Sequence, residues 1–192
     1  MMAGLTPTPS DNAQTSNADV TSEAVYWQGT YAITDKLNAT LGVRKSDDES
    51  DYTIEMTTTS PGIPFVQVPG KWSEVLEFGS TDPKLVLDYS FNENTMGYVS
   101  VSSGYKSGGF SFATWSESES RGGFNEEELD ATEIGVKYKS SDNRLVDNAA
   151  YYEYDYTDQQ QQIIVVTQSG SLAGKTFNAG ESEMTGLSLI HI

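Results

Sequence analysis

Apolar and polar side chains alternate with a period of two along most of the chain after residue 22. In each stretch one set of side chains is apolar and the alternate set is polar, which is typical of a β-strand with two different environments on its faces. Helical periodicity is nearly absent, so the sequence predicts an all-β fold. The clearest apolar sets are Val25, Trp27, Tyr31 and Ile33; Leu37, Ala39, Leu41 and Val43; Leu85, Leu87, Tyr89 and Phe91; Val99 and Val101; and Ile134, Val136 and Tyr138.

The same alternation predicts which side chains face water. The apolar members at 41, 43, 85, 87, 99, 101, 134 and 136 are expected on a convex face, and Thr40, Arg44, Lys84, Asp88, Ser100 and Glu133 on a concave, water-filled side. The strand from Leu145 to Tyr156 has tyrosines on both faces, so its facing stays open. Further strands are predicted at 160–168 and from residue 176 onward.

Connections between the predicted strands alternate between short and long. Tight turns are expected at 34–36, 92–94 and 141–143, where Asp and Asn supply turn-forming side chains. Long connections are expected at 47–82, 107–128 and 157–175. Membrane barrels show this alternation because their periplasmic turns are short and their outer loops are long. The chain is therefore predicted to be an antiparallel up-and-down meander, a partial section of a transmembrane β-barrel with long extracellular loops.

Aromatic residues gather where strands meet turns or loops, as at Tyr26, Trp27, Tyr89, Phe91 and the run 151–156. Girdles at the two bilayer interfaces would place aromatic side chains in this way. Tyr and Phe also favour strands in general, so this alternative stays open.

Composition narrows the function classes. The 192 residues contain no cysteine, which excludes disulfide scaffolds, thiolate metal sites and cysteine nucleophiles. The formal net charge of −17 is opposite to the basic footprint that nucleic-acid binding requires. The longest aliphatic run, 163–166, is far shorter than the roughly 20 apolar residues of a membrane-spanning helix.

No residue set predicts a catalytic, cofactor or metal site. The single histidine, His191, lies in the last five residues, whose origin is doubtful, and a Ser-His-Asp arrangement would have to use it, so hydrolytic catalysis is not expected. The segment 104–109 has the glycine spacing of a phosphate loop, but Phe110 and Ser111 follow where Lys and Ser or Thr are needed. The acids at 47–51 lack the glycine and glutamate spacing of a calcium loop. These acids are interpreted as solvated side chains of a long loop.

Three segments resemble the TonB-dependent outer-membrane receptor family. Residues 26–44 resemble a hairpin with a Thr-Asp-Lys-Leu turn and a Gly-Val-Arg ending. Residues 83–110 resemble a strand pair that ends in Gly-Tyr-Lys-Ser-Gly-Gly-Phe. Residues 132–138 and 148–152 resemble a Glu-Ile-Gly-Val-Lys strand and its partner. The segments occur in family order, and the resemblance covers about residues 22–187.

The resemblance implies part of a barrel of about 22 strands. Residues 1–21 are then expected to be a polar, disordered loop, 22–187 a partial receptor barrel, and 188–192 a non-native tail. The plug domain and the final barrel strands are expected to lie outside this chain.

The function that the resemblance implies is energised uptake of a scarce nutrient across the outer membrane of a Gram-negative bacterium, with a ferric siderophore-type chelate as the leading substrate. The implied partners are the nutrient, the inner-membrane protein TonB acting through the plug, and outer-membrane lipid, with no nucleic acid, cofactor or enzyme activity. Candidate substrate contacts in the loop after residue 106 are Lys106, Trp115, Arg121 and Phe124. Two alternatives stay open: a soluble extracellular β-domain that binds glycans, and an outer-membrane barrel enzyme with its catalytic residues elsewhere.

Overall fold

The computed structural model describes residues 12–58, 70–111, 123–166 and 172–192, and these residues form strands without any helix. None of this described part is therefore a helix that could cross a membrane. The strands are β1 (Asn12–Ala32), β2 (Leu37–Thr58), β3 (Gly70–Asn92), β4 (Thr95–Lys106), β5 (Glu127–Lys139), β6 (Val146–Thr157), β7 (Gln160–Val166), β8 (Leu172–Asn178) and β9 (Ser182–His191).

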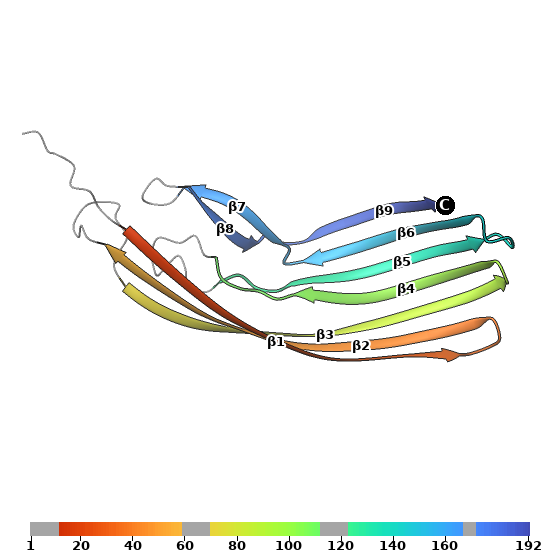
Figure 1. Ribbon diagram of the computed structural model, residues 1–192, viewed down its shortest axis with the longest axis horizontal. Coiled ribbons are helices and arrows are strands. Elements are labelled where there is room, and N and C mark those ends of the chain that lie inside the picture. The colour runs from red at the N-terminus through yellow and green to blue at the C-terminus, as the bar shows by residue number, and fades with distance from the viewer. Residues whose placement is uncertain (1–11, 59–69, 112–122, 167–171) are drawn as a thin grey trace, which may run out of the picture.

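One sheet contains seven strands in the order β1-β2-β3-β4-β5-β6-β9, and β7 and β8 form a separate two-stranded sheet. Every pairing is antiparallel, and β9 pairs with β6 because the β7–β8 hairpin is inserted between them. In Figure 1 the turns that join β1 to β2, β3 to β4 and β5 to β6 lie at one end of the sheet, and the β7–β8 hairpin lies at the other. The predicted all-β meander is confirmed.

Local hydrogen bonds explain the short turns. The Thr34 hydroxyl accepts bonds from the backbone N–H groups of Lys36 and Leu37 at 3.2 and 3.0 Å. In the turn between β5 and β6, Asp142 accepts bonds from the Ser140 hydroxyl at 2.6 Å and from the Arg144 N–H at 3.2 Å. Both bonds hold the pKa of Asp142 below its ordinary value, and the bond from the Ser140 hydroxyl has the larger effect. Side chains that replace backbone partners are what allow such tight reversals.

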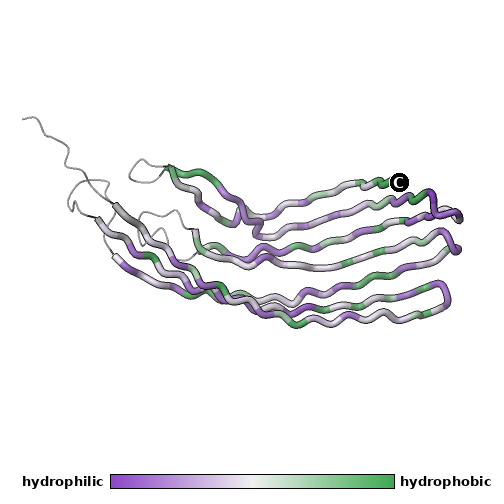
Figure 2. Tube along the Cα trace, in the orientation of Figure 1, coloured by the Kyte–Doolittle hydropathy of each residue, from purple (hydrophilic) through white to green (hydrophobic). Residues whose placement is uncertain are grey.

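The strand register gathers the predicted apolar residues on one face. Leu41 lies opposite Leu85, which lies opposite Val101, and a second row contains Leu87, Val99 and Ile134. Hydrophobic and hydrophilic residues alternate along these strands in Figure 2. The apolar side chains are uncovered, with Leu41 53%, Val99 42% and Ile134 55% exposed. A soluble β-domain would bury this face against a second layer, so that alternative does not describe these residues.

The opposite face contains the predicted polar residues. Thr40, Ser100 and Glu133 lie in one row across the sheet, and Asn38 donates to Asp88 at 2.8 Å. Residues here are generally more shielded than their strand neighbours, as in the alternating pattern of β3. Curvature explains this difference, because side chains converge on a concave face and spread apart on a convex one.

The register of β6 shows which face of the sheet each of its side chains occupies. Tyr152 pairs with Glu133, and Tyr151 pairs with Ile134. Tyr152, Tyr154 and Tyr156 therefore share the polar concave face, and Tyr151 joins the apolar row.

Several predicted boundaries are wrong. Residues 12–21, expected as loop, belong to β1, and most of the expected long loop 47–82 belongs to β2 and β3. The strand predicted at 160–168 is present as β7, whereas the strand expected from residue 176 begins earlier, at Leu172 in β8. In the parts of β2 and β3 that were expected as loop, the buried apolar side chains, such as Tyr52, Ile54 and Trp72, lie on the face that is polar in the rest of the sheet. The pattern on which the prediction relied therefore changes face while the backbone ladder continues. Residues 188–191 also continue the ladder in β9, whereas the pattern was expected to stop before them.

Candidate functional site

The sheet divides near its long-loop end. Pairing between β3 and β4 ends at Lys84 and Ser102, whereas β2 and β3 stay paired as far as Met56 and Gly70. Pro83 directly precedes Lys84 and has no N–H to donate, which accounts for the end of one ladder in a central strand. The parts of β1, β2 and β3 beyond this point, residues 12–27, 43–58 and 70–83, form a three-stranded extension that we call the arm (Figure 1).

The concave face of the arm carries an aromatic cluster. Tyr52, Ile54, Trp72 and Phe110 are buried, and Leu76 packs against them. The rings of Tyr52 and Phe110 are stacked with centroids 4.7 Å apart. Burial raises the pKa of Tyr52, and a hydrogen bond with Ser16 partly offsets this effect. The Trp72 indole N–H is buried and has no hydrogen-bond partner among the described residues.

Phe110 reaches this cluster from a segment that lies across the arm. This segment, residues 107–111 and 123–125, is called the strap. Its two parts are joined by reciprocal backbone bonds between Gly109 and Phe124, at 3.0 and 2.8 Å. Gly108 lies so close to the arm that a Cβ there would be 2.5 Å from the Phe78 ring. Gly123 has a φ of 53°, which favours glycine, and its Cβ would be 2.6 Å from Leu76.

The base of the β7–β8 hairpin holds the strap from the other side. The Gln160 amide donates to the carbonyl oxygens of Ser107 and Asn125, both at 3.0 Å. Asn178 accepts from the Asn125 N–H at 2.8 Å and donates to the Asn125 carbonyl at 3.0 Å. The Ser111 hydroxyl exchanges bonds with the Thr176 backbone. The strap is thus fixed between two elements distant in sequence.

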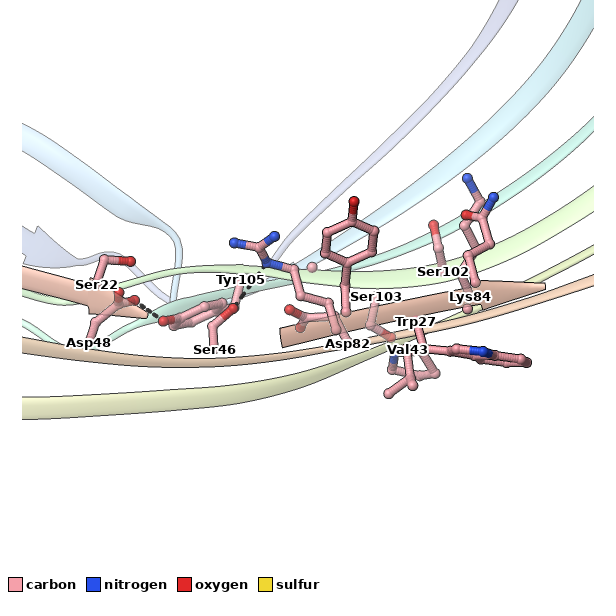
Figure 3. Close-up of a pocket in the computed structure, with 16 residues that line it drawn as sticks. Ser22, Trp27, Val43, Ser46, Asp48, Asp82, Lys84, Ser102, Ser103 and Tyr105 are labelled. Carbon is pink, nitrogen blue, oxygen red and sulfur yellow. Dashed lines mark hydrogen bonds between the residues drawn. The ribbon is translucent and has the colours of Figure 1, made fainter. Parts of the chain in front are cut away.

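A pocket of about 580 Å³ opens where the arm separates from β4. Figure 3 shows Lys84, Ser102 and Tyr105 on one side of the strands and Trp27 and Val43 on the other. A Cβ at Gly104, in the pocket wall, would meet no atom within 4 Å, so this glycine leaves open space.

The charged groups of the pocket differ in their partners. The Tyr105 hydroxyl donates to Asp48, and the Ser80 hydroxyl donates to Asp82 at 2.5 Å. Arg44 uses its Nε to donate to the Ser46 hydroxyl at 3.1 Å. Ion pairs within the described part of the chain join Lys45 to Asp47, Lys71 to Glu55 and His191 to Asp147, and include neither Arg44 nor Lys84. The pocket therefore contains two cations, Arg44 and Lys84, that form no ion pair within the described part of the chain, although Asp82 lies opposite Arg44 in the strand register.

No metal centre is formed by the part of the chain that the structure describes, where no three carboxylate or imidazole groups converge. Most acids of the arm lie instead on its outer face, and several oppose one another directly, as Glu49 opposes Glu77 and Asp19 opposes Asp51. Like charges directly opposite are unfavourable, so this face depends on water and counterions.

The predicted substrate contacts are only partly described. Phe124 belongs to the strap, and Lys106 ends β4 with its side chain exposed. Their contact with substrate stays a prediction. Trp115 and Arg121 lie outside the described residues, and their contact with substrate also stays a prediction. Sequence reasoning missed the pocket residues Arg44, Lys84 and Tyr105 as site residues, although it placed the first two on the water-facing side.

Comparison with known proteins identifies the fold. A family model described as TonB dependent receptor-like, beta-barrel matches residues 3–189. Among solved structures, the ferric yersiniabactin uptake receptor FyuA from Yersinia pestis is similar over 94% of this chain and 25% of its own length, with a TM-score of 0.74 and 20% identity.

Two further receptors show the same architecture. The ferric-catecholate import receptor Fiu from E. coli K12 is similar over 92% of this chain and 26% of its own, with a TM-score of 0.65 and 17% identity. The alcaligin outer membrane receptor FauA from Bordetella pertussis is similar over 92% of this chain and 27% of its own, with a TM-score of 0.57 and 16% identity. This chain spans about a quarter of the length of each.

Proposed function

Because the chain belongs to the TonB-dependent receptor β-barrel family, we propose that it forms one section of the wall of a nutrient receptor in the outer membrane of a Gram-negative bacterium. The uncovered apolar face supports this proposal, since lipid is the environment that makes such exposure favourable. The polar concave face would then line the lumen, and the long-loop end would face the outside.

The substrate we propose is an anionic ferric chelate of the siderophore type. The observation that carries this choice is the pocket with Arg44 and Lys84 on the concave face, close to the outer mouth. Charge-assisted hydrogen bonds to a carboxylate or phenolate oxygen are among the strong polar interactions. Tyr105 adds an aromatic surface beside the cations. FyuA is a ferric yersiniabactin uptake receptor and Fiu a ferric-catecholate import receptor, which agrees with this class of substrate.

The section contributes recognition and a passage, without covalent chemistry. Energy would come from TonB acting through a plug domain, which would contact the concave face from inside the barrel. Lys106, Trp115, Arg121 and Phe124, which belong to the end of β4 and to the connection between β4 and β5, are proposed as further substrate contacts.

Binding to the complete receptor tests the pocket. In the double variant Arg44→Ala/Lys84→Ala, the Kd of a labelled ferric chelate should rise at least tenfold, since each charged hydrogen bond contributes roughly 1.5–3 kcal/mol. Lys45→Ala is the matched control, because Lys45 is the next residue in β2 but lies on the outer face, paired with Asp47. Equal affinities of the double variant and the control would refute the pocket as the binding site.

A second variant tests the open space instead of the charge. Gly104→Leu meets no neighbouring atom at its Cβ, so it should leave barrel assembly unchanged while its side chain occupies the pocket. We expect weaker chelate binding with normal heat-modifiable migration in electrophoresis, which reports an intact barrel. Normal binding by Gly104→Leu would place the substrate elsewhere.

A further inference from the structure

An apolar groove of about 320 Å³ lies on the convex face, near the short-turn end of the sheet. It is centred on Gly97, whose register partners in the outward row are Tyr89 and Val136. Leu87 and Ile134 contribute to the adjoining row. All side chains that line it from this face are apolar or aromatic.

The groove exists because the outward row lacks one side chain. Gly97 has no Cβ, and the Phe91 ring leans toward the position that a Cβ would occupy, at 2.9 Å. Tyr89 and Phe91 meet edge to face with centroids 5.2 Å apart, which makes one wall rigid. A void against packed side chains forfeits dispersion contacts, so an apolar occupant is favoured.

The turn that leads into the groove carries a cation. Lys36 directly precedes Leu37, which lines the groove, and its Nζ is 3.5 Å from the Phe91 carbonyl oxygen. The Lys36 carbonyl accepts from the Ser90 N–H at 2.8 Å, which fixes this turn against β3. Glu93 belongs to the neighbouring turn and provides an opposite charge at the same end.

We propose that the groove holds one acyl chain of a phospholipid from the periplasmic leaflet, with the lipid phosphate at the Lys36 ammonium. The short turns of a membrane barrel face the periplasm, so this end meets that leaflet. An acyl chain fits a narrow groove without polar groups, and the phosphate is complementary to the cation beside its end. The inference rests on the proposed function, because it requires the convex face to contact lipid.

The test is lipid retention by the complete receptor, purified in mild detergent and titrated with phosphatidylglycerol in native mass spectrometry. Gly97→Val fills the floor of the groove and should lower the apparent affinity on the order of tenfold, as expected for losing a few buried methylenes. Lys36→Ala should lower it roughly two- to fivefold, as expected for an exposed ion pair.

Two variants serve as controls. Gly29→Val also adds a side chain on the outward face, under the Trp27 ring at the same 2.9 Å, but Gly29 is outside the groove. Glu93→Gln removes the acid at the same end. Both should retain the lipid at least as well as the wild-type receptor, and diacylglycerol, which lacks the phosphate, should bind equally to wild type and Lys36→Ala.

The outcomes separate this inference from the proposed function. Heat-modifiable migration and outer-membrane fractionation of the wild-type receptor test whether a barrel inserts, independently of bound lipid. Given an inserted barrel, equal losses in Gly97→Val and Gly29→Val, or no loss in Lys36→Ala, would overturn the groove as a phospholipid site.

Discussion

Replacing Phe110 by alanine should release the strap from the arm. Phe110 is only 6% exposed and is stacked on Tyr52, which is itself 1% exposed. Removing a buried phenylalanine side chain costs about 3–5 kcal/mol in a protein core. The cluster is small and lies at the edge of the sheet, so we take the lower end, about 3 kcal/mol, which corresponds to a roughly 100-fold larger open population.

Amide hydrogen exchange of the complete receptor measures this change directly. The reciprocal bonds between Gly109 and Phe124 are the reporters, because both amides are protected only while the strap is closed. In Phe110→Ala the exchange rates of these two amides should rise by up to the same factor as the open population. If opening the strap in the wild type costs less free energy than the lost contact supplies, the rates should instead reach those of unprotected amides. Amides of Val99 and Ile134, in the paired region of β4 and β5, should be unaffected.

Two results would refute this reasoning. Unchanged exchange at Gly109 and Phe124 would show that the strap is held without the aromatic cluster, for example by the β7–β8 hairpin alone. Equal acceleration at Val99 and Ile134 would show that the substitution loosens the whole sheet. Ser111→Ala provides a graded comparison, since it removes only the hydroxyl that bonds to Thr176 and should have a smaller effect of about 1 kcal/mol.

Three further changes have expected outcomes. In the complete barrel, Leu41→Arg should lower the free energy of unfolding from lipid by roughly 2–4 kcal/mol if it lies near the midplane, and Thr40→Arg should lower it far less; equal penalties in denaturant titrations would mean that the faces are reversed. Glu49→Lys, opposite Glu77, should stabilise the arm by about 0.2–1 kcal/mol, seen as slower amide exchange in β2 and β3, and faster exchange would contradict it. The lowered pKa of Asp142 means that its stabilising effect is present above the ordinary value of 3.8 and is lost as pH falls through the lower folded value. Amide exchange in that turn should therefore increase on acidification in the wild type and not in Asp142→Asn.

The sequence by itself determined the fold class and the two faces of the sheet. A residue such as Leu41 or Val99 must meet either lipid or water, and its strand neighbours must meet the other, so the solvent imposes a local pattern with a period of two. The short turns were predictable for the same local reason, because Thr34 and Asp142 bond to backbone groups two or three residues away. In the arm the apolar side chains lie on the concave face and most acids on the outer face, the reverse of the arrangement in the rest of the sheet. The extents of β1, β2 and β3 could therefore not be predicted from the same pattern.

Only the tertiary structure decided what the long-loop end contains. Tyr105 meets Asp48 across 57 residues, and Ser111 meets Thr176 across 65. Such contacts depend on the register of several strands and on the separation of β3 from β4 beside Pro83, which no single segment specifies. The groove over Gly97 arises in the same way, because a glycine becomes a cavity only when the neighbouring rows supply its walls. The alternation of apolar and polar residues reflects the environment that each side chain faces, which is a local property. A binding site, in contrast, is formed by residues from several strands that the folded register brings together.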